Sequence, residues 1–137
     1  MHHVLYNKEI NYTLGHAISW LMQCSDAINY LHSRTPTPTI HRDLKPLNLL
    51  LMKMGTLLKV CDFGSTANLK TTMTNDVGSP CWIAPEMLYK KDYNEKCDVY
   101  SYTVIAWEIM VRLHPYFHLK EINQFKLLLG VHSGIIL

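Results

Sequence analysis

The chain has 137 residues, of which 48% are hydrophobic and 18% are charged, a composition typical of one soluble globular domain with a core of ordinary size. The formal net charge of +2 is too small to indicate a nucleic-acid or membrane partner. No apolar stretch is long enough to span a bilayer. The 4 cysteines are widely spread and form no CxxC pair, which favours free thiols in a reducing compartment. This pattern indicates a cytosolic or nuclear protein, and the predicted location is cytoplasmic.

The first half of the chain predicts one long helix and one hairpin. Apolar residues recur at helical spacing over residues 13–33, which indicates an amphipathic helix. The sequence SRTPTPT at 33–39 ends this helix, because proline lacks an amide donor and restricts the residue before it. Two short apolar runs, 49–52 and 57–61, flank KMGT, where the glycine can supply a turn.

The second half predicts a long loop followed by two helices. Residues 64–80 are rich in Thr, Ser and Asn, and a loop of this length is usually functional or disordered. Residues 99–111 are apolar nearly all round, which is typical of a helix buried on most sides. A final helix is expected over 121–131, and Trp82 and Trp107 are expected in the core. The whole pattern predicts a mainly α-helical, α+β fold with a small β-hairpin.

Four polar residues have the chemistry that phosphoryl transfer needs. An enzyme of this class orients the attacking hydroxyl, holds Mg²⁺ on the phosphates and neutralises developing charge. Asp43 and Asn48 are five residues apart in one loop, and Asp62 follows the predicted hairpin. Carboxylate and amide oxygens suit magnesium, and the ammonium group of Lys45 suits a phosphoryl oxygen.

The sequences HRDLKPLN (41–48), DFG (62–64) and APE (84–86), in this order, resemble the C-terminal lobe of a protein kinase. The lysine within HRDLKP is typical of serine/threonine kinases. The longer stretches HAISWLMQCSDAINYLHS, LLKVCDFGSTANLKTTMTNDVGSPCWIAPE and NEKCDVYSYTVIAWEIMVR resemble MAP kinase kinase kinases of the transforming-growth-factor-beta-activated kinase type. The resemblance implies a protein-kinase-like fold, ATP and Mg²⁺ as cofactors, and a MAP kinase kinase as substrate. It also implies an activating adaptor protein on this lobe.

The resemblance assigns a role to each residue of the active site. Asp43 would orient the substrate hydroxyl, and Lys45 would stabilise the γ-phosphoryl group. Asn48 and Asp62 would hold magnesium. Leu50 would pack beneath the adenine ring.

Further residues are expected to support the site. His41 and Phe63 would stack within the core, and Gly64 completes the DFG sequence. Arg42 would pair with a phosphate on the activation segment. Asp98 would hydrogen-bond the backbone of the catalytic loop and would also cap the buried helix at its N-terminus.

The loop from 62 to 86 is expected to be an activation segment. Phosphate adds nearly two negative charges and strong acceptors, so a phosphate near Arg42 would order the loop. The resembled family keeps a hydroxyl near Lys45 and Asp43 at the position of Ser79. Ser79 is therefore expected either to be phosphorylated or to have a structural role. The candidate phosphorylation positions are Thr71, Thr72, Thr74 and Ser79.

The resemblance predicts that residues 1–137 form a partial kinase domain, without the N-terminal lobe and the C-terminal end. No two glycines are spaced as GxGxxG, and Glu86 is expected to lack its arginine partner. Thr103 stands where the family usually has glycine, so its side chain is expected to need space against the catalytic loop. Two functions remain open: a serine/threonine kinase represented by a fragment, and an inactive C-lobe protein that acts as a decoy or scaffold for kinase partners.

Overall fold

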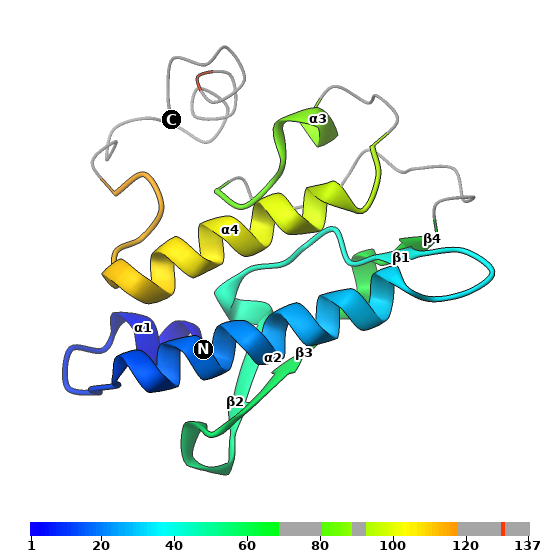
Figure 1. Ribbon diagram of the computed structural model, residues 1–137. Helices are drawn as coiled ribbons and strands as arrows, with labels where there is room; N and C mark the ends of the chain where they lie inside the picture. Colours follow the sequence, from blue (N-terminus) through cyan, green and yellow to red (C-terminus); the bar gives the residue numbers. More distant parts are fainter. Residues whose placement is uncertain (69–80, 89–92, 118–129, 131–137) are drawn as a thin grey trace.

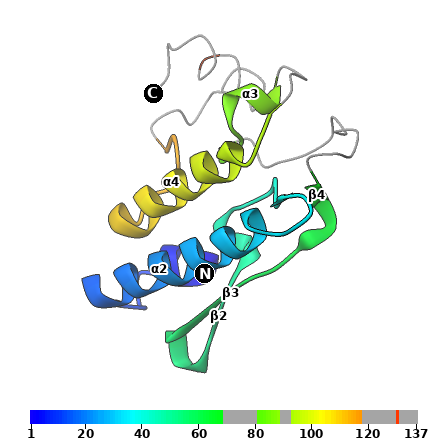
Figure 2. The ribbon, with the colours of Figure 1, turned by 45° about the vertical axis from the view of Figure 1, so that its right-hand side comes forward.

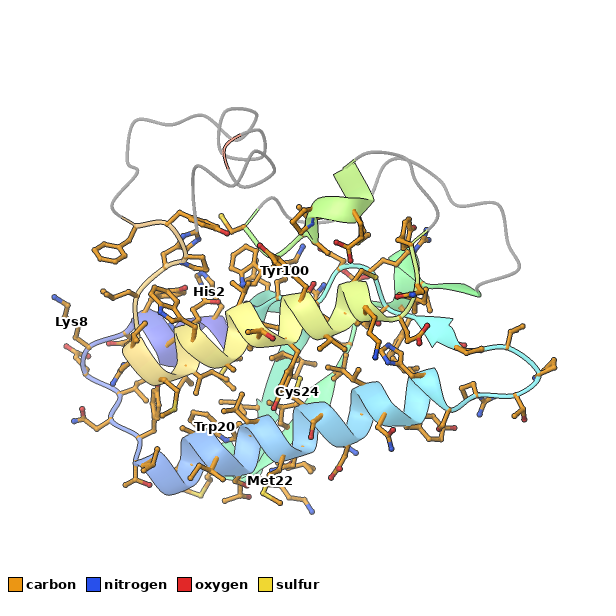
Figure 3. All side chains as sticks on the ribbon, turned by 45° about the horizontal axis from the view of Figure 1, so that its top comes forward. His2, Lys8, Trp20, Met22, Cys24 and Tyr100 are labelled. Carbon is orange, nitrogen blue, oxygen red and sulfur yellow. The ribbon has the colours of Figure 1, made fainter. Side chains whose placement is uncertain are left out.

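Two long helices form the centre of the structure (Figure 1). The computed structural model describes residues 1–68, 81–88, 93–117 and 130. Helix α2 (Leu14–His32) and helix α4 (Lys96–Val111) lie side by side and run in opposite directions. The largest core cluster joins the two helices, and Cys24 lies between them in Figure 3. This pair is the frame on which the loops of the site are carried.

Helix α2 confirms the prediction for residues 13–33. Its N-cap is Thr13, whose side chain accepts a hydrogen bond from the amide of His16, while the His16 ring accepts from the amide of Thr13. This reciprocal pair satisfies two amides that a helix start would otherwise leave without partners. The helix ends at His32, just before the Thr-Pro sequence.

The predicted hairpin is also confirmed. Strand β2 (Leu49–Met52) pairs with strand β3 (Leu57–Val60) in antiparallel register, with Leu49 opposite Val60. The Trp20 indole N–H donates to the carbonyl of Gly55 over 2.6 Å, which fixes the turn of the hairpin to α2. The tip of the hairpin extends beyond α2 on the side away from α4 (Figure 2). Because residue 49 follows the catalytic loop directly, α2 fixes one end of that loop.

Several short elements were not predicted from the sequence. They are α1 (His2–Tyr6), α3 (Pro85–Leu88), and the strands β1 (Thr39–Ile40) and β4 (Ala67–Asn68), which pair antiparallel. Strand β4 lies within the segment 64–80 that was expected to be a loop, so that prediction is wrong at residues 67–68. Elements of two to five residues are too short to show a hydrophobic period.

Helix α4 differs from its prediction in two ways. It begins at Lys96, three residues before the apolar run. The apolar pattern did not reveal this first turn, because the turn includes the polar residues Lys96 and Asp98. The expectation that it is buried on most sides is wrong, since a stripe along one face is exposed. Among the described residues, α2 packs on α4 beside this stripe: the Tyr102 hydroxyl donates to a carbonyl of α2, and Val99 borders a pocket that residues of α2 also line. The stripe consists of Val99, Thr103, Trp107 and Met110.

The two tryptophan predictions have different outcomes. Trp82 is buried, with 8% of its surface exposed, as expected for a core residue. Trp107 is 42% exposed on the open stripe of α4, so its assignment to the core is wrong. The helix predicted over 121–131 lies, apart from Gly130, outside the described residues. The mainly helical fold with a small antiparallel hairpin is confirmed.

Two expectations from the sequence concern the state of the cysteines and membrane-spanning segments. All four cysteines belong to described segments, and each is a free thiol. Of the helices in the part of the chain that the structure describes, none combines the length and hydrophobicity that a membrane-spanning segment requires.

Candidate active site

A buried carboxylate anchors the start of the loop that carries the predicted catalytic residues. Asp98 in the first turn of α4 is fully buried, and it accepts hydrogen bonds from the amides of His41 and Arg42, each over 2.9 Å. Its Oδ2 atom also lies 2.8 Å from Nε2 of His32 at the end of α2. Asp98 does not cap α4, because Glu95 is the N-cap and the amide of Lys96 donates to the side chain of Asn94. The N-cap prediction is therefore wrong.

The backbone at Arg42 is bent so that two consecutive amides meet the same carboxylate. Its φ of 70° lies in the left-handed region, which costs a non-glycine residue about 1–3 kcal/mol. The two hydrogen bonds to Asp98 offset this cost. The guanidinium group is buried and donates to the hydroxyl of Tyr93 over 3.2 Å. The segment 69–80, which would carry the phosphate expected to pair with Arg42, lies outside the described residues.

His41 joins the catalytic loop to the segment that carries DFG. The side chain is fully buried, and its Nε2 atom lies 3.0 Å from the carbonyl oxygen of Cys61. Its ring centre is 5.3 Å from that of Phe63, and the two planes are tilted by 56°. Phe63 itself is 51% exposed. His41 thus sits between both halves of the site, with no open side from which it could act as a base.

The side chains of Asp43, Lys45 and Asn48 are in direct contact. Oδ2 of Asp43 accepts a hydrogen bond from Nζ of Lys45 at 2.7 Å and another from Nδ2 of Asn48 at 3.1 Å. The same Nδ2 atom also donates to the backbone carbonyl of Asp43 over 2.7 Å. The ammonium group and the amide together fix the orientation of the carboxylate. The exposed fractions of the Lys45 and Asp43 side chains are 17% and 13%, so solvent reaches both.

Asp62 approaches this cluster from the end of the hairpin. The amide of Cys61 donates to the carbonyl of Asn48 over 2.9 Å, so the residue before Asp62 is fixed to Asn48. Asp62 has a φ of 64°, and its exposed carboxylate accepts a hydrogen bond from the amide of Gly64 at 3.4 Å. A Cβ atom at Gly64 would lie 3.3 Å from that carboxylate, a tight contact that glycine avoids. Leu50 is 48% exposed on β2, where an adenine ring could cover it.

Asn48 and Asp62 have the donor atoms that magnesium prefers. The amide nitrogen of Asn48 is turned to Asp43, which directs its oxygen away from that residue. Asp62 adds a carboxylate from the neighbouring segment. Among the described residues no three His, Cys, Asp or Glu side chains converge on one possible metal position. Two oxygen ligands from the protein fit Mg²⁺, because this ion usually keeps several waters and shares the phosphate oxygens of a nucleotide.

Other predicted residues lie away from this cluster or outside the described ranges. Glu86 is half-buried in α3, and no hydrogen bond joins it to another described residue. Thr103 is exposed, and its hydroxyl donates to the carbonyl of Val99 over 2.9 Å. The expectation that Thr103 presses against the catalytic loop is therefore wrong. The candidate phosphorylation positions Thr71, Thr72, Thr74 and Ser79 all lie outside the described residues.

Sequence reasoning missed a second buried carboxylate, Glu108, in the middle of α4. Its side chain is fully buried and accepts hydrogen bonds from the hydroxyl of Tyr6 and from the indole N–H of Trp82, the latter over 2.9 Å. Burial raises the pKa of Glu108 to about 8. The signal in the sequence was a single acidic residue inside an otherwise apolar helix, which indicates a buried polar contact.

The comparison with known families agrees with this geometry: residues 1–133 match the family model of the protein kinase domain. The chain belongs to the protein kinase family. Over 125 residues it is 49% identical to "Mitogen-activated protein kinase kinase kinase 7" of Mus musculus; the aligned region covers 90% of this chain and 21% of that protein. The Drosophila melanogaster protein of the same name is 48% identical over 117 residues, covering 85% of this chain and 17% of that protein. "Mitogen-activated protein kinase kinase kinase mom-4" of Caenorhabditis elegans is 41% identical over 114 residues, covering 82% of this chain and 21% of that protein. The chain therefore spans about a fifth of the length of these curated relatives.

Proposed function

We propose that the protein containing these residues transfers the γ-phosphate of ATP to a serine or threonine of a protein substrate. The observation that carries the proposal is the position of the Asp43 carboxylate. It lies between the ammonium group of Lys45 and the amide of Asn48, and the backbone bond between Asn48 and Cys61 brings Asp62 alongside. Phosphoryl transfer depends on such positioning, since it asks little covalent chemistry of the protein.

Each side chain of the cluster has a separate task in this proposal. Asp43 accepts a hydrogen bond from the substrate hydroxyl and orients it for attack. Lys45 stabilises charge on the transferred phosphoryl group, and its contact with Asp43 keeps the ammonium at the reaction centre. The oxygen of Asn48 and the carboxylate of Asp62 would hold Mg²⁺, which neutralises phosphate charge when bound.

The names of the relatives support the proposed substrate class. They carry the name of MAP kinase kinase kinases, and the lysine of HRDLKP is typical of serine/threonine kinases. The proposed substrate is therefore a MAP kinase kinase, within a MAP kinase cascade in the cytoplasm. An activating adaptor protein would bind the same lobe. The free cysteines of the described segments support a reducing compartment.

The domain proposal is that residues 1–137 supply part of the C-terminal lobe, and that a second lobe closes over the nucleotide. Exposed apolar side chains beside the cluster support it: Leu47 is 59% exposed, Leu50 48% and Phe63 51%. Exposed apolar side chains next to polar site residues in the sequence are consistent with a surface that another molecule or domain covers. The same side chains support a second candidate, in which the chain binds kinase partners as a decoy or scaffold without catalysis.

Substitution of Asp43 by Asn separates the two candidates. The experiment uses the longest natural protein that contains these residues, radiolabelled ATP and a recombinant MAP kinase kinase. Asp43→Asn should lower turnover by about 10²–10⁴, because the hydroxyl loses its acceptor. Nucleotide affinity should change little, since Asp43 is assigned to the hydroxyl. A variant that keeps more than about a tenth of the wild-type turnover would contradict the kinase proposal, as would a wild-type protein that transfers no phosphate.

A further inference from the structure

Glu108 lies where three segments of the fold meet. It belongs to α4, while its two hydrogen-bond donors come from α1 and from the segment that precedes α3. The Tyr6 hydroxyl donates to Oε1, and the Trp82 indole donates to Oε2 over 2.9 Å. The hydroxyl of Ser101 on α4 also donates to the backbone carbonyl of Trp82 over 2.7 Å. Trp82, in the last part of the predicted activation segment, is thus bound to α4 through both its backbone carbonyl and its indole ring.

No described cation neutralises this carboxylate. Arg112, the residue that follows the last turn of α4, directs its guanidinium group to backbone carbonyls of α1 and of Asn7 at 2.9–3.2 Å. The ring of His114 packs on Trp82 and Tyr6, with ring centres 5.5 and 6.0 Å apart, but it does not bond to Glu108. Further titratable groups near the cluster, among the described residues, are His2, whose ring lies 4.8 Å from that of Tyr6, and Cys81, which precedes Trp82 in the chain.

The neutral form of Glu108 suits this environment better than the charged form. A buried carboxylate without a countercharge loses hydration that two neutral donors replace only in part. The pKa of Glu108 is raised to about 8 by burial. When the carboxyl is protonated, its hydroxyl can donate to Tyr6 while its carbonyl oxygen still accepts from Trp82. Both contacts are therefore compatible with the neutral group.

We propose that Glu108 is a proton-sensitive latch, which in its neutral form holds Trp82 and α1 against α4 and which loosens when the carboxyl loses its proton. The charged group needs water, and water reaches it only if Tyr6 or Trp82 moves away. Arg112 and the Met1 ammonium group hold the backbone of α1 in place, so the expected movement is confined to the side chains of Tyr6 and Trp82. The effect on catalysis rests on the proposed function, because Trp82 belongs to the predicted activation segment. The latch itself does not depend on that function.

Proton NMR of the indole groups in the 137-residue chain tests the latch without ATP or substrate. The chain has 3 tryptophans, so at most three indole N–H signals appear, and Trp82→Phe identifies the relevant one. The pH is varied from 6 to 9 in wild type, in Glu108→Gln, and in Asp26→Asn, which removes an exposed carboxylate of α2 as the matched control. Gln keeps one donor and one acceptor in the place of the protonated carboxyl.

The Trp82 signal should shift with a midpoint near pH 8 in wild type and in Asp26→Asn, and this transition should be absent in Glu108→Gln. Any transition that remains in Glu108→Gln comes from a neighbouring group and does not report Glu108. Tyr6→Phe gives a second measurement: Glu108 loses one of its two hydrogen-bond partners, so the midpoint should move away from the wild-type value. A Trp82 signal that does not titrate, that titrates equally in Glu108→Gln, or whose midpoint is unchanged in Tyr6→Phe would overturn the latch. A failure of phosphate transfer would leave these signals unaffected.

Discussion

At the scale of single residues, Asp98 determines the conformation of the catalytic loop. One fully buried carboxylate accepts from two consecutive amides and lies within hydrogen-bond distance of a histidine ring. Hydrogen bonds to a charged acceptor are stronger than those between neutral groups. They hold the left-handed backbone at Arg42, and Asp43 follows directly. The position of the proposed catalytic carboxylate therefore depends on a residue more than fifty positions away in the chain.

Asp98→Ala should destabilise the chain by at least about 1–3 kcal/mol, because buried amides of the catalytic loop lose their acceptor. Thermal denaturation followed by circular dichroism measures the effect, with Asp26→Asn as the surface control. An Asp98→Ala melt that coincides with the wild-type melt would exclude this role.

The sequence identified the residues of the cluster but not all their partners. The residue types and the spacing of two short motifs predict the chemistry of Asp43, Asn48 and Asp62. Glu108 was missed because its donors, Tyr6 and Trp82, are 102 and 26 residues away along the chain. Periodicity reports which face of a helix is apolar, and it does not report a polar contact between distant segments.

At the scale of elements, α2 and the β2–β3 hairpin were predictable because each has a strong local signal. Helix α2 has an apolar period and a proline sequence at its end, and the hairpin has two apolar runs around a glycine. The pairing of β1 with β4 was not predictable, since two-residue strands that are 27 residues apart depend on the tertiary fold. The exposed stripe of α4 was mispredicted because an apolar helix shows no preferred face in its sequence.

The packing of α1 on α4 makes the stability of the chain depend on pH through Glu108. Its folded pKa of about 8 is raised from 4.5, so its contribution to stability is complete below pH 4.5 and is lost as the pH rises to about 8. Glu108→Gln does not titrate. The difference between the melting temperatures of the wild type and of this variant should therefore favour the wild type more at pH 5 than at pH 8.5. Parallel pH profiles for the two proteins would show that Glu108 does not titrate in this range.

At the scale of the whole molecule, the 137-residue chain presents the proposed phosphate contacts from one side. Lys45, Asn48 and Asp62 lie on adjacent segments, and the exposed Leu50 and Phe63 lie beside them on β2 and next to Asp62. Charges in an open site are screened by water, whereas a closed site strengthens them. Positioning of the reactants can supply roughly 7–11 kcal/mol of a barrier, and in the proposed two-lobe arrangement these residues supply only part of it.

Residues 1–137 alone should therefore transfer phosphate to a protein substrate at no useful rate. The measurement is incorporation of radiolabel from ATP by the purified chain, with Asp43→Asn as the control for contaminating kinases. Robust transfer that disappears in the control would show that these residues are catalytic without a second lobe.

Broadening of amide NMR signals by Mn²⁺-ATP tests the proposed metal and nucleotide site most directly. Mn²⁺ accepts the same oxygen ligands as Mg²⁺, and its unpaired electrons broaden the signals of nearby nuclei. The amide signals of Asn48, Cys61 and Asp62 should broaden first, while that of Asp26 stays sharp. In Asp62→Asn, where a charged ligand is lost, the broadening should require a much higher concentration. Equal broadening in the variant, or broadening centred on Asp26 and its neighbours, would contradict the assignment of Asn48 and Asp62 to the metal.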